Sequence, residues 1–542
     1  MKRVLLLCLV LSTLPLPGVA VSGWTRFDAK VPMSDGVRLD ASVYIPAGPT
    51  PPGGFPLVVR QHGGGSNKNS PYDVGYGLKF VKTGNFALLM YSHRGHGASG
   101  GSFDFFGPRT TKDFSDMLDW IARRFAGRID ANRVAVNGYS QGGGESLLPA
   151  ENDPRVKVAA VGNTFANLNR ALNPNDCMKF AFATGIFAAA YKAAGARTDD
   201  ATAVRWGVTL YTDTEDVSTP LYPSTTDELD ARSPTAGLQH LIDRRVPVFW
   251  SQSWEDQLFP PDHPEVILRP LEQAGIPVHY WFSSGGHAAG PNFPDDEVAK
   301  EAAMRDWIDE FLRGVDHGYR AGVTPKVTYW ERTEAGLPGT WIPRSTTAWP
   351  PPATTWTSLY VGPGRSLSGT KRGGGSAGTI VNDFVSANLA HDSIAANEVP
   401  GRVPFPQLGD VVRRVPESPN PLDAVTYRSA PLRSAFRSVG APIVDAELGT
   451  SARRVVQLDA KVWDLAPDGS ATLVNRLCFS AAHPKARQRV RFALWPDAHT
   501  YAAGHRVALT LSSVDFPTFK PDTKPAVTHI LIGTRLLVPV QR

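Results

Sequence analysis

The sequence predicts a mixed α/β domain followed by an antiparallel β-sandwich. Up to residue 318, short apolar runs alternate with stretches of helical spacing, and this alternation favours a mostly parallel sheet covered by helices. Beyond residue 320, Thr- and Val-rich stretches and clusters of proline and glycine replace the helix-forming segments. A chain of 542 residues is long enough for two or more domains, each with its own core.

The strands of the first domain are predicted from its apolar runs. Between residues 37 and 45 every second residue is apolar, so that one face of a strand collects Val37, Leu39, Ala41, Val43 and Ile45. Largely apolar runs, typical of buried parallel strands, cover residues 57–59, 86–91, 134–136, 158–161, 246–250 and 278–282. Apolar residues at helical spacing predict helices over 111–125 and 296–313.

Residues 166–238 interrupt this alternation. Their apolar residues recur roughly at helical spacing, and a polar stretch follows them: Phe180, Phe182, Ile186, Phe187 and Tyr191. We predict a mainly helical insertion that caps the active edge of the sheet, with a peripheral pair of helices as the alternative. The α/β domain then consists of residues 24–165 and 239–318, and the sandwich of residues 320–542. Two segments of the sandwich alternate as strands do, 456–462 and 506–511.

Residues 1–20 have the pattern of a cleavable secretory signal peptide. A basic start at Lys2 and Arg3 precedes an apolar run over residues 4–14, and small residues follow near Ala20. The run is too short to span a bilayer as a mature helix, and an uncleaved N-terminal anchor is the alternative. We therefore expect a secreted or periplasmic protein that has no membrane contact after cleavage.

Composition and charge favour an ordinary globular protein. Hydrophobic residues make up 42% and charged residues 20% of the chain, and the net charge is +5. The basic residues are scattered, with no block longer than a pair, so we expect no nucleic-acid partner. After signal cleavage, Cys177 and Cys478 would remain as one disulfide or as two free buried thiols. No cysteine pair has metal-ligand spacing, and we expect no metal and no cofactor.

A nucleophile candidate lies directly after the strand 134–136. Gly138, Ser140 and Gly142 form a Gly-x-Ser-x-Gly motif, and a glycine-rich stretch of helical character follows. This is typical of the nucleophile elbow of an α/β-hydrolase, where the serine sits on a sharp turn and side chains two residues away would collide. A plain glycine-rich turn is the alternative.

A serine nucleophile needs a base, and the base needs a carboxylate that orients it. In this fold the chain order is serine, acid, histidine, and the acid and the histidine each follow a strand. Asp256 and His287 follow the last two predicted strands of the α/β domain. Glu255 is the rival acid, and His263 and His279 are the rival bases; His279 lies inside a strand, which favours a packing role.

The oxyanion hole needs two donors aimed at the developing charge. One predicted donor is the backbone N–H of Gln141, directly after the nucleophile. The other is the N–H of Gly64, or of Gly63, in the loop after the strand 57–59; a flexible glycine turn is the alternative. We expect His62 in this loop to be structural, and we assign no role to His93 and His96.

Elbow, inserted cap, acid, histidine and β-sandwich, in this order, resemble the X-Pro dipeptidyl-peptidase and cocaine-esterase family of serine hydrolases. The likeness extends over nearly all of the mature chain, and the segments that carry it are 33–39, 94–100, 427–432, 462–469 and 504–507. It implies an α/β-hydrolase domain with an inserted helical cap and a C-terminal jelly-roll-like sandwich. It also implies that cap and sandwich together wall the acyl pocket.

One departure concerns the oxyanion loop. Cocaine-esterase-like members have Pro-Tyr after the oxyanion strand, and the tyrosine hydroxyl helps to hold the oxyanion. Here residues 62–65 read His-Gly-Gly-Gly, which favours two backbone donors.

These observations predict a secreted serine hydrolase that cleaves an ester or amide bond through an acyl-enzyme on Ser140. Its substrate would be a small-molecule ester, an amide or a short peptide. X-Pro dipeptidyl aminopeptidase activity is one alternative, although we identify no carboxylates in the cap to hold a substrate amine. A non-catalytic binding protein is an alternative of another class. The sequence predicts no oligomeric state.

Overall fold

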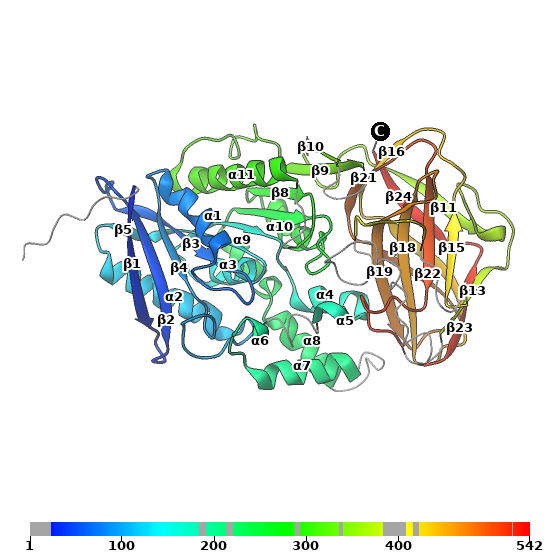
Figure 1. Cartoon of the computed structure of the whole chain (residues 1–542), viewed down its shortest axis with the longest axis horizontal. Coiled ribbons are helices and arrows are strands. Elements are labelled where there is room, and N and C mark those ends of the chain that lie inside the picture. The colour runs from blue at the N-terminus through cyan, green and yellow to red at the C-terminus, as the bar shows by residue number, and fades with distance from the viewer. Residues whose placement is uncertain are drawn as a thin grey trace, which may run out of the picture.

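The computed structural model describes residues 23–183, 191–212, 221–287, 293–334, 340–382, 408–415, 422–522 and 524–541. The predicted signal peptide, together with Ile186 and Phe187 of the predicted cap, lies outside the described residues. An α/β domain and a β-sandwich lie side by side along the long axis, with the helices between residues 168 and 231 beneath and between them (Figure 1). No helix in the described ranges is long and apolar enough to cross a bilayer.

The α/β domain is built on one mixed sheet. Its strands follow the order β1–β2–β4–β3–β5–β6–β7–β8–β9–β10, parallel from β4 to β9 and antiparallel at both ends. This confirms the predicted mostly parallel sheet. The bounds are β1 Trp24–Pro32, β2 Arg38–Pro46, β3 Phe55–Gln61, β4 Ala87–Tyr91, β5 Ile129–Tyr139, β6 Val156–Gly162, β7 Val248–Ser253, β8 Val278–Ser283, β9 Val327–Glu334 and β10 Thr340–Thr346.

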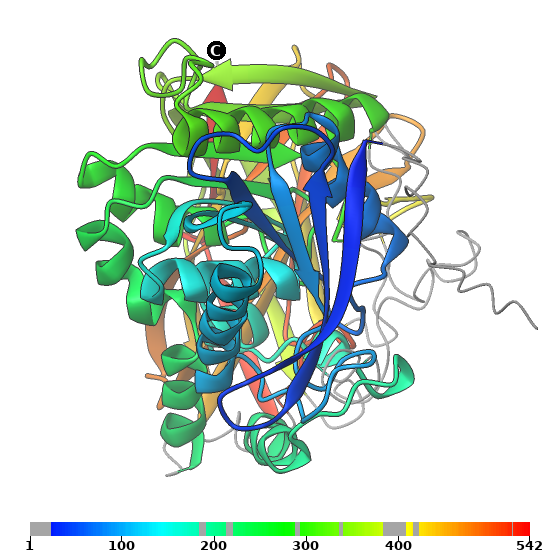
Figure 2. The ribbon, with the colours of Figure 1, turned by 90° about the vertical axis from the view of Figure 1, so that its left-hand side faces the viewer.

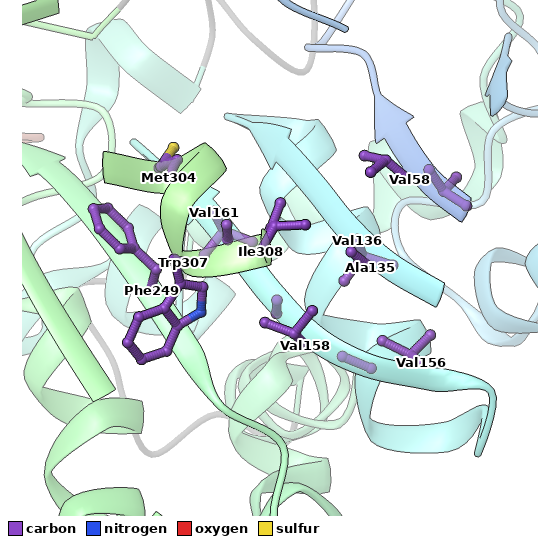
Figure 3. Packing of buried hydrophobic residues seen from close by; sticks show 14 of the residues in the cluster. Val58, Ala135, Val136, Val156, Val158, Val161, Phe249, Met304, Trp307 and Ile308 are labelled. Carbon is purple, nitrogen blue, oxygen red and sulfur yellow. The ribbon is translucent and has the colours of Figure 1, made fainter. Parts of the chain in front are cut away.

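Helices cover both faces of this sheet (Figure 2). Met304, Trp307 and Ile308 of one of them, α11, are at most 1% exposed and lie against sheet residues such as Val161 and Phe249 (Figure 3). Burial of such a side chain contributes about 1.5–3 kcal/mol to the stability of the fold. Apolar residues at helical spacing therefore predict a helix that packs one face on the sheet. The helices are α1 Pro71–Lys82, α2 Pro108–Arg124, α3 Gln141–Asn152, α9 Leu238–Asp243, α10 His263–Gln273 and α11 Pro294–Arg313.

The sheet continues beyond the predicted end of the α/β domain at residue 318. Strand β9 pairs in parallel with β8, with Tyr280 opposite Val327, and β10 then pairs with β9. Strand β21 of the sandwich in turn meets β9 at His499 and Arg332. A strand-like pattern after residue 320 does not show which sheet the strand joins. Strand β9 joins the sheet of the α/β domain.

The inserted segment is mainly helical, as predicted. Its elements are α4 Leu168–Leu172, η1 Pro174–Asp176, α5 Phe180–Ala183, α6 Tyr191–Ala193, α7 Asp200–Thr212, α8 Leu221–Ala231 and η3 Pro234–Gly237. It has its own apolar cluster, in which Trp206, Leu210 and Leu229 join Phe103, Phe105 and Phe106 from the loop before α2. This shared cluster fixes the cap to the α/β domain.

The C-terminal part is an antiparallel β-sandwich, as predicted. One sheet contains β14, β19, β18, β22 and β15; the other is built around β17, which pairs with β20, β23 and β24. The bounds are β11 Thr355–Gly362, β12 Ser366–Ser368, β13 Ser376–Asn382, β14 Val411–Val412, β15 Ala424–Arg428, β16 Phe436–Gly440, β17 Ile443–Thr450, β18 Val455–Leu465, β19 Ala471–Ala482, β20 Arg487–Ala493, β21 Asp497–Tyr501, β22 Arg506–Ser512, β23 Ala526–Leu531 and β24 Arg535–Gln541.

A disulfide joins the cap to the sandwich. Cys177, just after η1, is bonded to Cys478 in β19, with Cα atoms 5.9 Å apart. The sequence left open whether these two cysteines form a disulfide or remain free thiols, and in the structure they form a disulfide. Backbone hydrogen bonds from Ala181 to Pro517 (2.9 Å) and from Lys520 to Met178 (2.8 Å) lie beside it.

Candidate active site

Ser140 occupies the sharp turn between β5 and α3. Its φ of 58° and ψ of −129° are unfavourable for a residue with a side chain, at a cost of about 1–3 kcal/mol. A Cβ atom on Gly138 would lie 2.1 Å from the carbonyl oxygen of Gly142, and one on Gly142 would lie 2.3 Å from that of Gln61. Both positions therefore require glycine, as the motif predicted.

The structure brings the three predicted triad residues together. His287 Nε2 lies 2.9 Å from Ser140 Oγ, and His287 Nδ1 lies 2.8 Å from Asp256 Oδ2. The carboxylate makes Nδ1 the protonated nitrogen, so that Nε2 is free to accept the serine proton. This is the arrangement that a nucleophilic serine requires.

Asp256 is completely buried, and its carboxylate is fully hydrogen-bonded. Oδ1 accepts the backbone N–H groups of Leu258 and Phe259, both at 2.9 Å, and Oδ2 accepts the side-chain amide of Gln252 at 3.0 Å. A buried carboxylate needs such donors to stay ionised and in place. The turn of residues 256–259 thus fixes the direction in which Asp256 faces His287.

Asn163 ties the two loops of the acid and the base together, which the sequence did not predict. Its Oδ1 accepts the N–H of Ser253 at 2.9 Å, and its Nδ2 donates to the carbonyl of His287 at 3.0 Å. An asparagine after a strand is a common turn residue, so its type alone gave no signal.

The rival acid and bases are engaged elsewhere. Glu255 forms a buried ion pair with Arg332 of β9. His263 Nδ1 accepts the N–H of Ala166 at 3.1 Å, and burial holds its pKa well below the usual range. His279 stacks on Phe249 with ring centroids 4.7 Å apart, and burial lowers its pKa to about 3, which confirms the predicted packing role.

The predicted oxyanion donors lie beside Ser140. Gly63, Gly64 and Gln141 line the same cavity as Ser140 and His287. Across the ranges that the structure describes, the backbone N–H groups of Gly64 and Gln141 have no acceptor. Donors left open towards a catalytic serine are what an oxyanion hole needs.

His62 fixes the orientation of this loop. Its Nε2 accepts the N–H of His93 at 3.0 Å, so the proton of the neutral ring is on Nδ1, which donates to the carbonyl of Gly63 at 2.8 Å. Burial lowers the pKa of His62 to about 4, which keeps the ring neutral. In a trans peptide the C=O of Gly63 and the N–H of Gly64 point in opposite directions, so His62 turns that N–H away from itself.

A cavity of about 670 Å³ opens in front of Ser140. Its wall contains side chains of two kinds. Five are apolar, Phe106, Leu168, Leu172, Leu258 and Phe259, and others are polar or charged, Ser66, Ser70, Tyr72, Asp73, Glu297 and Lys300. Leu168, Leu172 and Tyr191 come from the cap, so the cap forms part of the wall.

The sandwich does not reach this cavity within the described residues, because the lining residues all lie between Gly63 and Lys300. The expected direct contribution of the sandwich to the pocket wall is therefore wrong for this part of the chain. The cap and the turn after Asp256 lie between the sandwich and the cavity. Gln257 of that turn accepts a hydrogen bond from Arg476 of β19 at 3.4 Å.

Among the described residues that line the cavity, both carboxylates are paired with cations. Arg60 donates from Nε (3.0 Å) and Nη2 (2.7 Å) to Asp73, and Lys300 donates to Glu297 at 2.6 Å. A paired carboxylate attracts a substrate ammonium far less than an unpaired one. Among the described side chains, no three His, Cys, Asp or Glu residues gather in a way that could hold a metal ion.

Two family models match successive parts of the chain. The X-Pro dipeptidyl-peptidase (S15 family) model matches residues 35–289, and the model of the X-Pro dipeptidyl-peptidase C-terminal non-catalytic domain matches residues 321–534. The two ranges correspond to the α/β part with its cap and to the sandwich.

Solved structures share the whole architecture. An aminopeptidase from the marine sediment archaeon Thaumarchaeota archaeon is 17% identical, with a TM-score of 0.73, over 98% of this chain and 99% of its own. An α-amino acid ester hydrolase is 17% identical, with a TM-score of 0.71 and the same coverage. A CocE/NonD family hydrolase from Staphylococcus aureus is 14% identical, with a TM-score of 0.66, over 95% of this chain and 93% of its own. At these identities the likeness establishes the fold.

A curated relative matches a shorter segment. The quorum-quenching protein AidA of Acinetobacter baumannii is 31% identical over 154 residues, which are 27% of this chain and 47% of that protein. The chain thus spans about half the length of this relative.

Proposed function

The chain belongs to the X-Pro dipeptidyl-peptidase (S15) family of serine hydrolases, and on this premise we propose that it cleaves small esters or amides through Ser140, His287 and Asp256. The observation that carries the proposal is the continuous hydrogen-bond chain from Ser140 Oγ through His287 to Asp256, at 2.9 and 2.8 Å, beside a cavity.

The reaction proceeds by acyl transfer. Ser140 Oγ attacks the substrate carbonyl while His287 Nε2 takes the serine proton, and Asp256 stabilises the resulting imidazolium. The N–H groups of Gly64 and Gln141 bind the tetrahedral oxyanion. His287 then protonates the leaving alcohol or amine, and the acyl group stays on Ser140. Water, deprotonated by His287, attacks the acyl-enzyme and releases the acid, which restores the serine.

The cavity favours an ester or amide with an apolar group over an X-Pro peptide. Five apolar side chains of its wall, from the cap, the α/β loops and the turn after Asp256, suit an alkyl or aryl group of the substrate. An X-Pro peptidase must hold the free N-terminal ammonium of its substrate. The carboxylates of the cavity, Asp73 and Glu297, are each already paired with a cation. Ester hydrolysis is therefore the first candidate activity and X-Pro cleavage the second.

Two measurements test the proposal. A fluorophosphonate probe should label the wild-type protein and fail to label Ser140→Ala; equal labelling of both would place the nucleophile elsewhere. Rates on p-nitrophenyl esters of increasing acyl length should then exceed those on X-Pro-p-nitroanilides. Higher rates on the X-Pro-p-nitroanilides than on the esters would establish X-Pro peptidase as the main activity.

We also propose that the protein works in a secreted or periplasmic compartment. The basic start and apolar run of residues 1–20, together with a disulfide between Cys177 and Cys478, support an oxidising environment. Sequencing the N-terminus of protein from the culture medium and the periplasm tests this; an intact Met1 on cytosolic protein would contradict it.

A further inference from the structure

Lys179, at the entrance to α5 in the cap, is a completely buried lysine that has no carboxylate partner in the described part of the chain. It is 0% exposed, and within the described ranges no carboxylate lies within ion-pair distance of its ammonium group. Its Nζ instead donates to the backbone carbonyls of Gln257 at 2.9 Å and Leu258 at 2.5 Å. Burial lowers the pKa of Lys179 to about 7. Lysine is rarely buried in this way, so the position calls for a function.

The two carbonyls belong to the peptide groups that hold the carboxylate of Asp256. The C=O of Gln257 and the N–H of Leu258 are the two ends of one peptide group, and the C=O of Leu258 and the N–H of Phe259 are the two ends of the next. Lys179 binds both carbonyl ends, and Asp256 Oδ1 accepts both N–H ends at 2.9 Å. Two aligned peptide dipoles thus lie between an amine and a carboxylate.

We propose that Lys179 is a positioning residue for the acid of the triad, an inference that rests on the proposed function of Asp256. By holding the carbonyl ends, Lys179 fixes the planes of both peptide groups and aims their N–H groups at Asp256. When Lys179 is protonated, its charge also polarises these peptides, which strengthens the hydrogen bonds that they donate. The carboxylate is thereby kept facing His287 Nδ1.

The backbone on either side of Lys179 is anchored to the sandwich. Cys177 is bonded to Cys478, the carbonyl of Met178 accepts the N–H of Lys520 at 2.8 Å, and the N–H of Ala181 donates to Pro517 at 2.9 Å. The domain that contributes no described lining residue to the cavity therefore acts on the catalytic acid through the cap.

The test uses the mature full-length protein with the substitutions Lys179→Met and Lys179→Gln. Methionine is similar in length to lysine but has no hydrogen-bond donor. Glutamine keeps an amide donor on a shorter side chain. Lys192→Met is the matched control, since Lys192 is an exposed lysine of the same cap, paired with Asp200. For each protein we would record kcat, KM and the low-field proton resonance of the hydrogen bond between His287 and Asp256, which needs no substrate.

Lys179→Met should lower kcat by roughly ten- to hundredfold, as expected for a misplaced catalytic group, with KM within about twofold. In Lys179→Met the low-field resonance should also shift or broaden. Lys179→Gln should have a kcat and a resonance between those of Lys179→Met and the wild type. Lys192→Met should match the wild type in both. A wild-type resonance and kcat in folded Lys179→Met would overturn the proposal. If the methionine variant does not fold, wild-type values in Lys179→Gln would overturn it instead.

The resonance separates this inference from the proposed function. If the wild type hydrolyses none of the tested substrates, the proposed function fails, but the resonance still reports whether Lys179 orients Asp256. If the wild type is active and the lysine variants change neither readout, only the positioning role fails.

Discussion

The side of the proposed nucleophile, Ser140, and the side of the proposed acid, Asp256, are held in different ways. Ser140 and the proposed oxyanion donors depend on backbone sterics within two short segments, where Gly138 and Gly142 leave no room for a Cβ atom. Asp256 and His287 depend on side chains that are distant in sequence. Asn163 joins their loops, and Lys179 binds the turn after Asp256.

This difference shows where each side is vulnerable. On the nucleophile side, a methyl group added to Gly138 or Gly142 should be enough to destroy the site, because it would collide with backbone atoms of neighbouring segments. On the acid side, a methyl group should be tolerated, and the loss of one remote polar group should matter more. The predictions below compare the two sides, beginning with the largest expected effect.

Asp256→Asn should lower kcat on the order of 10³–10⁴-fold, because an amide favours the wrong tautomer of His287 and places an N–H group against other donors. Glu255→Gln is the matched control from the same turn. It should destabilise the protein by breaking the buried pair with Arg332, while kcat per folded molecule stays within about threefold. Steady-state kinetics and thermal melting measure both. A larger loss of kcat in Glu255→Gln than in Asp256→Asn would reverse the assignment of the acid.

Gly142→Ala should lower activity by at least about a hundredfold or prevent folding, because the new Cβ would lie 2.3 Å from the carbonyl oxygen of Gln61. Gly286→Ala, next to His287, is the comparison on the acid side. Among the described residues beyond its two chain neighbours, the atom nearest to its Cβ would be the carbonyl oxygen of Glu255 at 3.6 Å, which is ordinary contact. We expect kcat within about twofold of the wild type. Equal damage by both alanines, in kcat and in soluble yield, would remove the contrast between the sides.

Much of the fold, and the meeting of the three predicted triad residues, could be predicted from the sequence for one reason. Parallel strands deliver the residues that follow them to one edge, so Ser140, Asp256 and His287 had to approach each other once their strands were recognised. The glycines of the elbow carried a steric signal in their type. Helical spacing within residues 166–238 and strand-like stretches beyond residue 320 predicted the cap and the sandwich, and the resemblance to a family supported both.

The remaining features had no local signal. Lys179 binds backbone carbonyls, which every residue has, so no partner residue pointed to it. Strand β9 has an ordinary strand pattern, and only the geometry of the sheet edge decides that it joins β8. The bonding of Cys177 to Cys478 depends on an approach across 301 residues, which spacing alone does not reveal.

His62→Leu should lower kcat by roughly ten- to hundredfold with little change in KM, because the Gly63–Gly64 peptide loses the donor that orients it. His62→Asn should recover part of this loss, since its amide can donate from about the position of Nδ1. His96→Asn is the control: its ring lies 5.1 Å from that of His62 but bonds to the carbonyl of Arg94. Kinetics on an ester substrate measure all three. If asparagine at position 62 is no better than leucine, packing rather than hydrogen bonding accounts for the effect.

Replacing Cys177 and Cys478 together by serine should have the smallest effect on activity and a clear effect on stability. A native disulfide typically contributes about 2–4 kcal/mol, so Tm should fall by several degrees. We expect kcat to fall by only about two- to fivefold, because the hydrogen bonds of Met178 and Ala181 still hold the chain around Lys179. A reducing agent should cause the same changes in the wild type and none in the double variant. If kcat instead falls as far as in Lys179→Met, the disulfide is the main support of the acid side, and the control of Asp256 lies in the sandwich rather than in the cap.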